Sequence, residues 1–139
     1  MTIGTCLCGA VTVTVTPAEA SLHACHCEMC RRWTGSALLA FAVASDGLTS
    51  DGPVRTRASS DWAERAWCDE CGSNLWYRVT AQGPHEGDHH VSAGLFDDLE
   101  ALPLTSEIFH DCKPSGWSYA QDTEKRTRAE VLAAFGDGA

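Results

Sequence analysis

Alternation of apolar and polar residues along the chain predicts a mostly β protein. In residues 11–16, valines alternate with threonines at a period of two until Pro17 ends the pattern. A period of two in β-branched residues is typical of a strand that buries one face, so the valines should face the core. Cys6 and Cys8 have the opposite parity to the valines. We therefore expect a bulge at Gly9 and cysteine side chains that point away from the valine core.

Further segments have the length and composition of strands. They carry apolar or β-branched residues, and turn residues such as Gly, Pro, Asp and Ser separate many of them. Short strands with frequent turns are typical of a mostly β architecture. The segments are 22–27, 37–43, 54–58, 64–68, 75–80 and 89–96.

Only one helix is well signalled, at the C-terminal end of the chain. Thr127 and Glu130 have the spacing of a capping box, apolar residues follow at helical spacing to Phe135, and Gly136 supplies a C-terminal stop. Residues 28–34 are expected to form a single turn. The pattern as a whole predicts a mostly β fold with one short C-terminal helix.

Length and composition indicate one soluble domain over residues 1–139, because a chain of this length buries one core but not comfortably two. Hydrophobic residues at 44% and charged residues at 21% are ordinary values. No apolar stretch approaches the roughly 20 residues of a membrane helix. The first residues lack the features of an export signal, so we expect a cytoplasmic protein. A net charge of −9 argues against a nucleic-acid partner, since phosphate binding needs clustered Lys and Arg.

The eight cysteines are the main departure from average composition. Four disulfides would be the alternative in a secreted protein, but this chain lacks an export signal and is too long to depend on them. Most of the cysteines instead stand in three tight groups, which is typical of metal ligands. The groups are Cys6-Leu7-Cys8-Gly9, Cys25-His26-Cys27-Glu28-Met29-Cys30 and Cys68-Asp69-Glu70-Cys71-Gly72.

The first and last groups together supply the ligands of a closed zinc site. On a strand, residues i and i+2 face the same way about 7 Å apart, so a C-x-C pair converges on one ion after modest bending. In C-x-x-C followed by glycine, a tight turn brings both thiolates together. Structural zinc takes four tetrahedral ligands. We therefore assign Cys6, Cys8, Cys68 and Cys71 to a structural zinc.

The middle group offers three thiolates, from Cys25, Cys27 and Cys30. Three protein ligands with an open fourth position are the arrangement of a catalytic zinc site. The sequence therefore predicts a second zinc ion per chain, at which chemistry takes place. The alternative is a second closed site, completed by a more distant residue among His23, His26, His110 and Cys112.

The remaining histidines and the lone cysteine have plainer interpretations. His26 lies between two cysteines that face the same way, so its ring should point to the other side of the strand and pack there. Cys112 stands alone in the sequence and is expected to be a bystander thiol. The histidines in or beside the polar loop 83–88 are expected to be solvated, and these are His85, His89 and His90.

A zinc ion bound by three thiolates is suited to thiol chemistry. The negative charge of the ligands weakens zinc as a Lewis acid, whereas a sulfur-rich site favours a further sulfur ligand and deprotonates it. The predicted substrate is a small thiol or its adduct. Arg31 and Arg32 follow Cys30 and are candidates to bind a substrate carboxylate, although a solvated position suits them equally. Candidates for a general base are Glu28, His26 and His110.

The three cysteine groups resemble the signatures of a known family. Residues 6–9, 25–31 and 68–75 look like the three motifs of the glutathione-dependent formaldehyde-activating enzyme family, which also contains centromere protein V. The order and spacing of the motifs make the resemblance specific. It covers the chain from about Gly4 to Trp117.

The resemblance implies an Mss4-like, or β-tent, fold with two zinc ions per chain, the structural one on Cys6, Cys8, Cys68 and Cys71 and the catalytic one on Cys25, Cys27 and Cys30. The reaction that names the family joins glutathione to formaldehyde and gives S-hydroxymethylglutathione, which is carbon-sulfur lyase chemistry. A small thiol such as glutathione is then the expected partner. The alternative function is a zinc-stabilised binding module without catalysis, as the relationship to centromere protein V suggests.

Overall fold

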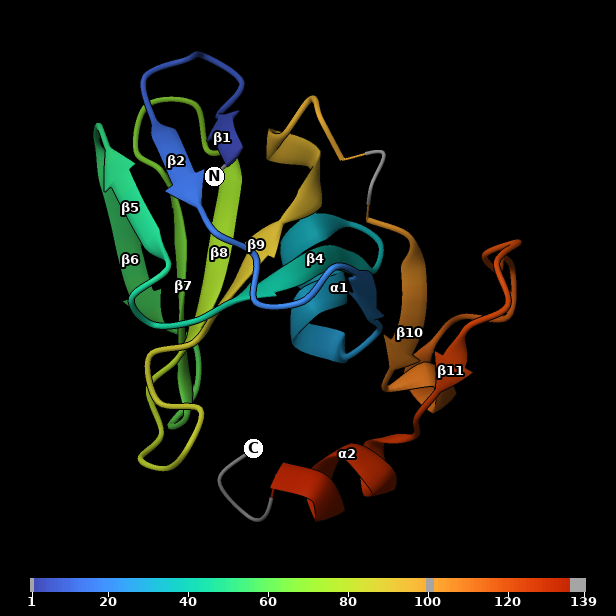
Figure 1. The fold of residues 1–139 in the computed structure, drawn as a ribbon. Coiled ribbons are helices and arrows are strands. Elements are labelled where there is room, and N and C mark those ends of the chain that lie inside the picture. The colour runs from blue at the N-terminus through green and yellow to red at the C-terminus, as the bar shows by residue number, and fades with distance from the viewer. Residues whose placement is uncertain (1, 100–101, 136–139) are drawn as a thin grey trace.

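The computed structural model describes residues 2–99 and 102–135, which form two β-sheets and two short helices (Figure 1). The smaller sheet has the strand order β1-β2-β5, and both of its pairings are antiparallel. Its strands are β1 (Thr2–Thr5), β2 (Thr12–Val15) and β5 (Leu48–Asp51).

The larger sheet has the strand order β11-β10-β3-β4-β9-β8-β7-β6. Strand β10 runs parallel to both β3 and β11, and the other neighbours are antiparallel. The strands are β3 (Leu22–Cys25), β4 (Leu38–Val43), β6 (Val54–Ala58), β7 (Ala63–Cys68), β8 (Asn74–Val79), β9 (His89–Ser92), β10 (Leu104–Ile108) and β11 (Glu124–Lys125).

Each segment that the sequence pattern predicts as a strand contains one. The segment 89–96 divides, because β9 ends at Ser92 and a 3₁₀ turn follows at Ala93–Leu95. The pattern does not predict β1, β5, β10 and β11. These strands are short and largely polar, so pairing with neighbours rather than alternation makes them strands.

The predicted C-terminal helix is present as α2 (Arg128–Phe135), with both bonds of its capping box formed. The Glu130 N–H donates to Thr127 Oγ1 at 3.2 Å, and the Thr127 N–H donates to Glu130 Oε1 at 3.1 Å. The predicted stop at Gly136 lies outside the described residues. Where the sequence suggests a single turn, the chain forms a second helix, α1 (Glu28–Thr34).

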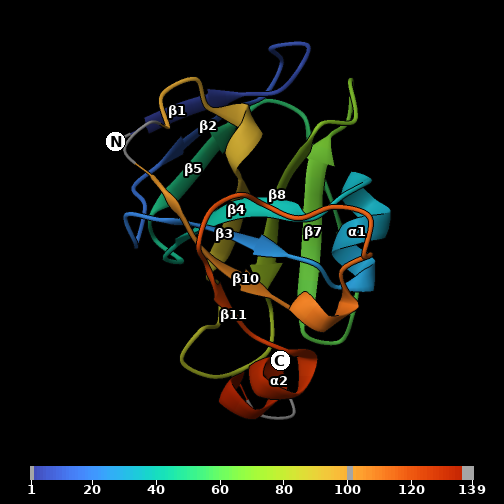
Figure 2. The same cartoon turned by 90° about the vertical axis from the view of Figure 1, so that its right-hand side faces the viewer.

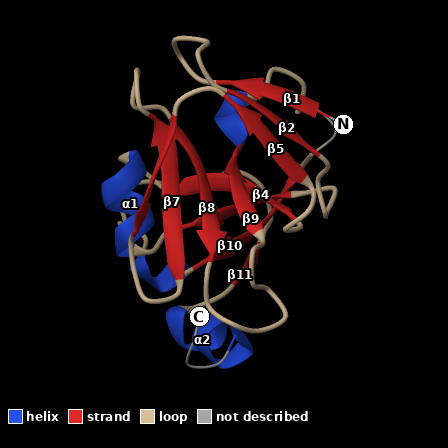
Figure 3. Ribbon diagram, turned by 90° about the vertical axis from the view of Figure 1, so that its left-hand side faces the viewer, coloured by secondary structure: helices blue, strands red, loops and turns tan. Residues whose placement is uncertain are grey.

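The main core lies between the small sheet and one face of the large sheet, and Figure 3 shows the two sheets side by side. Val11, Val13 and Val15 are almost completely buried there, as their alternation predicts. From the large sheet, Phe41 packs edge to face against Phe96, with 5.2 Å between the ring centroids. Apolar contact between the two sheets therefore holds the N-terminal strands in place.

The predicted orientation of the first cysteine is wrong. Cys6 is buried in the valine core, and its Sγ accepts a hydrogen bond from the Val11 N–H at 3.3 Å. Gly9 does not form a bulge within a strand, since it lies at φ 81° in the turn between β1 and β2. Strand parity does not apply to residues in a turn, which explains the difference.

The opposite face of the large sheet borders a cavity of about 910 Å³. On β3, Ala24 faces the core while His23 and Cys25 line the cavity. Residues from the connection 79–88 and from α2 also line it. Figures 1 and 2 show α2 below the sheets, apart from the core. No helix in the described part of the chain has the length and apolar character needed to span a bilayer.

Replacing Phe41 by alanine tests the position of the core. The ring is fully buried, so Phe41→Ala should lower the free energy of unfolding by about 3–5 kcal/mol. The control is Ile3→Ala on β1, where the side chain is 66% exposed and the loss should stay below about 1 kcal/mol. Urea unfolding of both variants provides the measurement. Similar losses for the two would contradict this placement of the core.

Candidate metal centres

The first cysteine group has the geometry of a closed tetrahedral site. The Sγ atoms of Cys6, Cys8, Cys68 and Cys71 all lie within 4.8 Å of one another. The sulfurs of Cys6 and Cys8 are 3.6 Å apart, and those of Cys8 and Cys68 are 3.9 Å apart. Zinc bonds to sulfur at about 2.3 Å, which places tetrahedral sulfurs roughly 3.8 Å from one another. The structure thus brings together the four residues that the spacing assigns to one site.

Hydrogen bonds connect the two turns that carry this group. The hydroxyl oxygen of Ser73 accepts from the Leu7 N–H at 2.9 Å and lies 3.2 Å from the Sγ of Cys71. The Ser73 hydroxyl is also the main reason that the pKa of Cys71 falls to about 5. The sequence does not single out Ser73, because its partner Leu7 is remote along the chain.

The second group lies where β3 passes into α1. Cys25 is the last residue of β3, Cys27 caps the N-terminus of α1, and Cys30 is in its first turn. The three sulfurs lie within 4.8 Å of one another. The Cys30 N–H donates to the Sγ of Cys27 at 3.3 Å, so the start of the helix holds two of the sulfurs together.

Crowding of these thiols makes the group suitable for a cation. Two hydrogen bonds to the sulfur of Cys27, the more important from Cys25 and the other from Cys30, lower the pKa of Cys27 to about 2. The same bond to Cys27, together with Cys30 and burial, raises the pKa of Cys25 well above its ordinary value. Three neighbouring sulfurs therefore do not all ionise unless positive charge is supplied. A soft divalent cation such as zinc fits this donor set.

In the described part of the chain, this second group has three members. None of the residues considered as a fourth ligand belongs to it. The Sγ of Cys112 instead accepts a hydrogen bond from Arg128 Nη2 at 3.4 Å. The four residues concerned are His23, His26, His110 and Cys112.

Arg65 is the residue that sequence reasoning missed. It is 5% exposed and lies between the rings of Trp33 and Tyr77, with its Cζ 4.8 and 5.1 Å from their centroids. Its Nη1 and Nη2 donate to the Sγ of Cys30 at 3.8 and 3.7 Å. Among the described residues, no carboxylate forms an ion pair with it. Its charge is therefore directed at the thiolates.

The sequence offers a weak signal for Arg65. It lies three residues before Cys68 on β7, so strand parity places it on the face opposite that buried cysteine. Its contact with Cys30 depends on how α1 packs, which the pattern does not reveal. Arg31 and Arg32 follow Cys30 in α1 but do not line the cavity. Their binding role stays a prediction.

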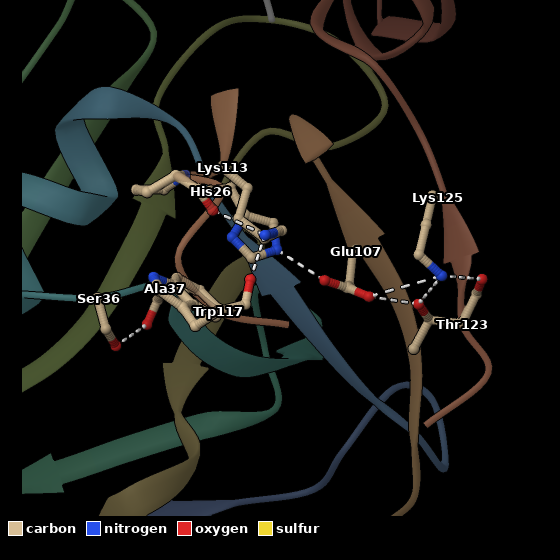
Figure 4. A network of polar contacts seen from close by, with 9 residues as sticks. His26, Ser36, Ala37, Glu107, Lys113, Trp117, Thr123 and Lys125 are labelled. Carbon is tan, nitrogen blue, oxygen red and sulfur yellow. Dashed lines mark hydrogen bonds and ion pairs between the residues drawn. The ribbon is translucent and has the colours of Figure 1, made fainter. Parts of the chain in front are cut away.

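On the other side of the sheet, a buried network of hydrogen bonds stabilises the end of β3 (Figure 4). His26 Nε2 lies 2.8 Å from Glu107 Oε1, and the hydroxyl of Thr123 donates to Glu107 Oε2. Burial acts to raise the pKa of Glu107, but the hydrogen bonds from Thr123 and His26 outweigh it and leave the pKa lowered. The His26 ring packs against Trp117, with 5.3 Å between the centroids. His26 thus packs on the other side, as its position between two cysteines predicts.

Of the candidate general bases, only Glu28 lines the cavity. Its Oε1 lies 3.5 Å from Arg128 Nη2. His26 is buried against Glu107, and His110 packs on the His26 ring with 5.8 Å between the centroids. These two histidines therefore belong to the network behind the site.

The expectation of solvated histidines holds for His85 and is wrong for His89 and His90. Both belong to β9, which pairs with β4 on one side and β8 on the other. His89 is 7% exposed and packs against Trp76. His90 lines the cavity, and burial lowers its pKa to about 3. A central place in the sheet overrides the polar character of the neighbouring loop.

Comparison with known proteins identifies the family. Residues 1–112 match the family model described as glutathione-dependent formaldehyde-activating enzyme. The chain belongs to this family. An uncharacterized lyase of Schizosaccharomyces pombe is 32% identical over 133 residues, covering 95% of both chains. A Halomonas elongata protein, provisionally named a glutathione-dependent formaldehyde-activating enzyme, is 28% identical and covers 96% of this chain and 88% of its own.

A solved structure supports the fold. The crystal structure of a Rhodobacter sphaeroides protein matches with a TM-score of 0.56 and 23% sequence identity. The match covers 74% of this chain and 99% of that chain. The fold is thus that of a mostly β protein with two short helices, and membership of the formaldehyde-activating family makes it a glutathione-related lyase at the level of the family.

The His26–Glu107 pair provides a test of how firmly β3 is held. Glu107→Ala leaves a buried imidazole N–H without its acceptor and should lower the free energy of unfolding by about 1–3 kcal/mol. The matched control is Asp69→Ala, which removes a 2.7 Å ion pair whose side chains are 62% and 48% exposed. That loss should be below about 1 kcal/mol. Urea unfolding at saturating zinc measures the free energy of unfolding of both variants. Equal losses would contradict the view that burial makes the His26–Glu107 pair more important than the exposed pair.

Proposed function

We propose that this protein is a zinc-dependent carbon-sulfur lyase of the S-hydroxymethylglutathione synthase type. It acts on a small thiol or thiol adduct, with glutathione and formaldehyde as the reactants that the family name indicates. Cys25, Cys27 and Cys30 hold the catalytic zinc, and Cys6, Cys8, Cys68 and Cys71 hold the structural zinc.

One observation carries the proposal: a group of three cysteines borders a large cavity. Cys25, Cys27 and Cys30 all line the 910 Å³ space, whose volume lies in the range of sites for organic ligands of moderate size. The four-cysteine group does not line it. Access for a ligand therefore distinguishes the two groups, and it favours chemistry at the second.

Zinc bound by these three cysteines would supply a soft cation that keeps a substrate thiol ionised at neutral pH. The thiolate sulfur of the substrate attacks the carbonyl carbon of formaldehyde and forms the carbon-sulfur bond. The π electron pair of the carbonyl moves to oxygen, which takes up the proton released by the thiol. The reverse steps break the same bond.

Arg65 supports this reaction through its charge. The substrate thiolate enters a site that already contains three thiolates, so repulsion opposes its binding. The buried guanidinium at Cys30 offsets that repulsion, and its contacts with the rings of Trp33 and Tyr77 keep it beside the sulfur. Arg65 is therefore a positioning residue in the proposal.

Replacing Cys27 by serine tests the catalytic zinc. Cys27→Ser should reduce the metal content from about two zinc ions per chain to about one and slow the reaction at least about 100-fold. Zinc analysis and exchange NMR on mixtures of glutathione and formaldehyde give the two readouts. The control is Cys112→Ser, which changes a cysteine outside both groups and should keep both values. A normal exchange rate in Cys27→Ser would refute the proposal.

Replacing Arg65 by methionine tests the role of its charge. Because a unit charge at this range interacts with a thiolate by a few kcal/mol, Arg65→Met should weaken glutathione binding about 10- to 100-fold, and Arg65→Lys should recover part of it. Calorimetric titration of zinc-loaded protein measures the affinity, with zinc content as a second readout. Arg57 is exposed, is paired with Arg65 in the sheet and does not line the cavity, so Arg57→Met is the matched control. Equal affinities for the two methionine variants would exclude a role for the Arg65 charge.

A further inference from the structure

Four side chains that can donate hydrogen bonds form a line along the cavity face of the large sheet. Register places Arg65 opposite Tyr77 and Tyr77 opposite His90 on three adjacent strands. His90 in turn lies against His23 of β3, with the rings edge to face and 5.0 Å between their centroids. All four line the cavity. We call Arg65, Tyr77, His90 and His23 the donor row.

The hydroxyl of Tyr77 and the imidazoles of His90 and His23 are available to a ligand. In the described part of the chain, the imidazoles of His90 and His23 and the hydroxyl of Tyr77 make no hydrogen bond to protein. Buried polar groups in folded proteins normally have partners, and each one without a protein partner calls for an explanation. Within the row, the fully buried atom without a partner is the Nδ1 of His90, and the ring that carries it lines the cavity, where a bound ligand would be its neighbour.

The side chains of the donor row suit a ligand that carries hydrogen-bond acceptors. The phenol of Tyr77 carries an O–H that can donate a hydrogen bond. Burial lowers the pKa of His90 to about 3, so its ring is neutral and carries one N–H. The Nδ1 of His90 is buried without a partner. Because a buried acceptor without a partner is more readily tolerated than a buried donor without one, we assign the proton to Nε2. Carboxylate or amide oxygens are the matching ligand groups.

Acidic residues at the cavity do not oppose this assignment strongly. Four acidic residues in the described part of the chain line the cavity. Glu28 lies 3.5 Å from Arg128 Nη2, Glu124 lies 2.6 Å from Arg126 Nε, and Asp88 lies 3.2 Å from His85 Nδ1, whereas Glu19 is exposed to solvent. The carboxylates of Glu28 and Glu124 are therefore largely offset by neighbouring arginines. The donors come from the sheet itself, whereas these two ion pairs come from α1, β11, α2 and the segment that leads into α2.

We propose that the donor row binds the carboxylate or amide oxygens of the thiol substrate while its sulfur reaches the three-cysteine group. This inference rests on the proposed function. At one end of the row Arg65 donates to the Sγ of Cys30, whereas at the other end His23 is two residues from Cys25 on one face of β3, a backbone distance of roughly 7 Å. A substrate must span that distance. The thiol and carboxylates of glutathione lie on successive residues, each spanning roughly 3.5 Å, whereas 2-mercaptoethanol is too short.

The test compares two thiols on variants of the middle of the row. His90→Phe keeps the ring shape and removes the donor, and it should weaken glutathione binding about 5- to 100-fold, as expected for a lost buried hydrogen bond. Binding of 2-mercaptoethanol should not change, because this thiol is too short to reach His90 from the metal. His90→Gln keeps an N–H donor and should stay within about 3-fold of wild type. Absorption of the cobalt-substituted protein reports thiol binding at the metal.

Tyr77→Phe gives an independent variant that removes one hydroxyl and leaves the ring beside Arg65 in place. It should also weaken glutathione selectively, by about 5-fold or more. The matched control is Tyr119→Phe, which removes the hydroxyl of a tyrosine that packs on His26 and does not line the cavity. It should leave both affinities unchanged.

The outcomes separate the two proposals. Unchanged glutathione affinity in both His90→Phe and Tyr77→Phe would overturn the donor row, even though thiols still bind at the metal. Equal weakening of both thiols would also overturn it, because the effect would then lie at the metal. Failure of the wild-type protein to bind either thiol at the metal would instead refute the proposed function.

Discussion

Mutual repulsion among closely packed sulfur atoms is the constraint on which the rest of this structure depends. Two groups, one of four cysteines and one of three, hold their sulfurs within 4.8 Å of one another. Thiolates at such distances stay ionised only if cations or hydrogen-bond donors stabilise them. The surroundings supply donors at both groups, from Val11 and Ser73 at one and from the start of α1 and Arg65 at the other.

Local sequence information was sufficient for much of the fold. The valine alternation identifies β2, and the capping box identifies α2, because both signals lie within a few residues. The spacing of the cysteines likewise gives the membership of both groups. In C-x-C and C-x-x-C the local backbone sets the distance between the sulfurs of each pair, and the preference of structural zinc for four ligands indicates that the two distant pairs share one ion.

Residues whose role depends on sheet pairing were not predictable in the same way. Glu107 meets His26 across a separation of 81 residues, because β10 pairs in parallel with β3. Arg65, Tyr77 and His90 become neighbours only through the register of β7, β8 and β9. A one-residue change of register would turn these side chains to the other face. Single-sequence patterns do not specify register, so they suggested a solvated His90 and gave no role to Arg65.

The two cysteine groups also differ in how much of the chain they enclose. The four-cysteine group joins Cys6 and Cys8 to Cys68 and Cys71, so a metal ion there would link the turn after β1 to the end of β7 across some sixty residues. The three-cysteine group lies within a single strand-to-helix junction. Closing a long loop restricts the unfolded chain far more than closing a short one. Loss of an ion from the junction would therefore release only a short loop, whereas loss of an ion from the four-cysteine group would release a long one.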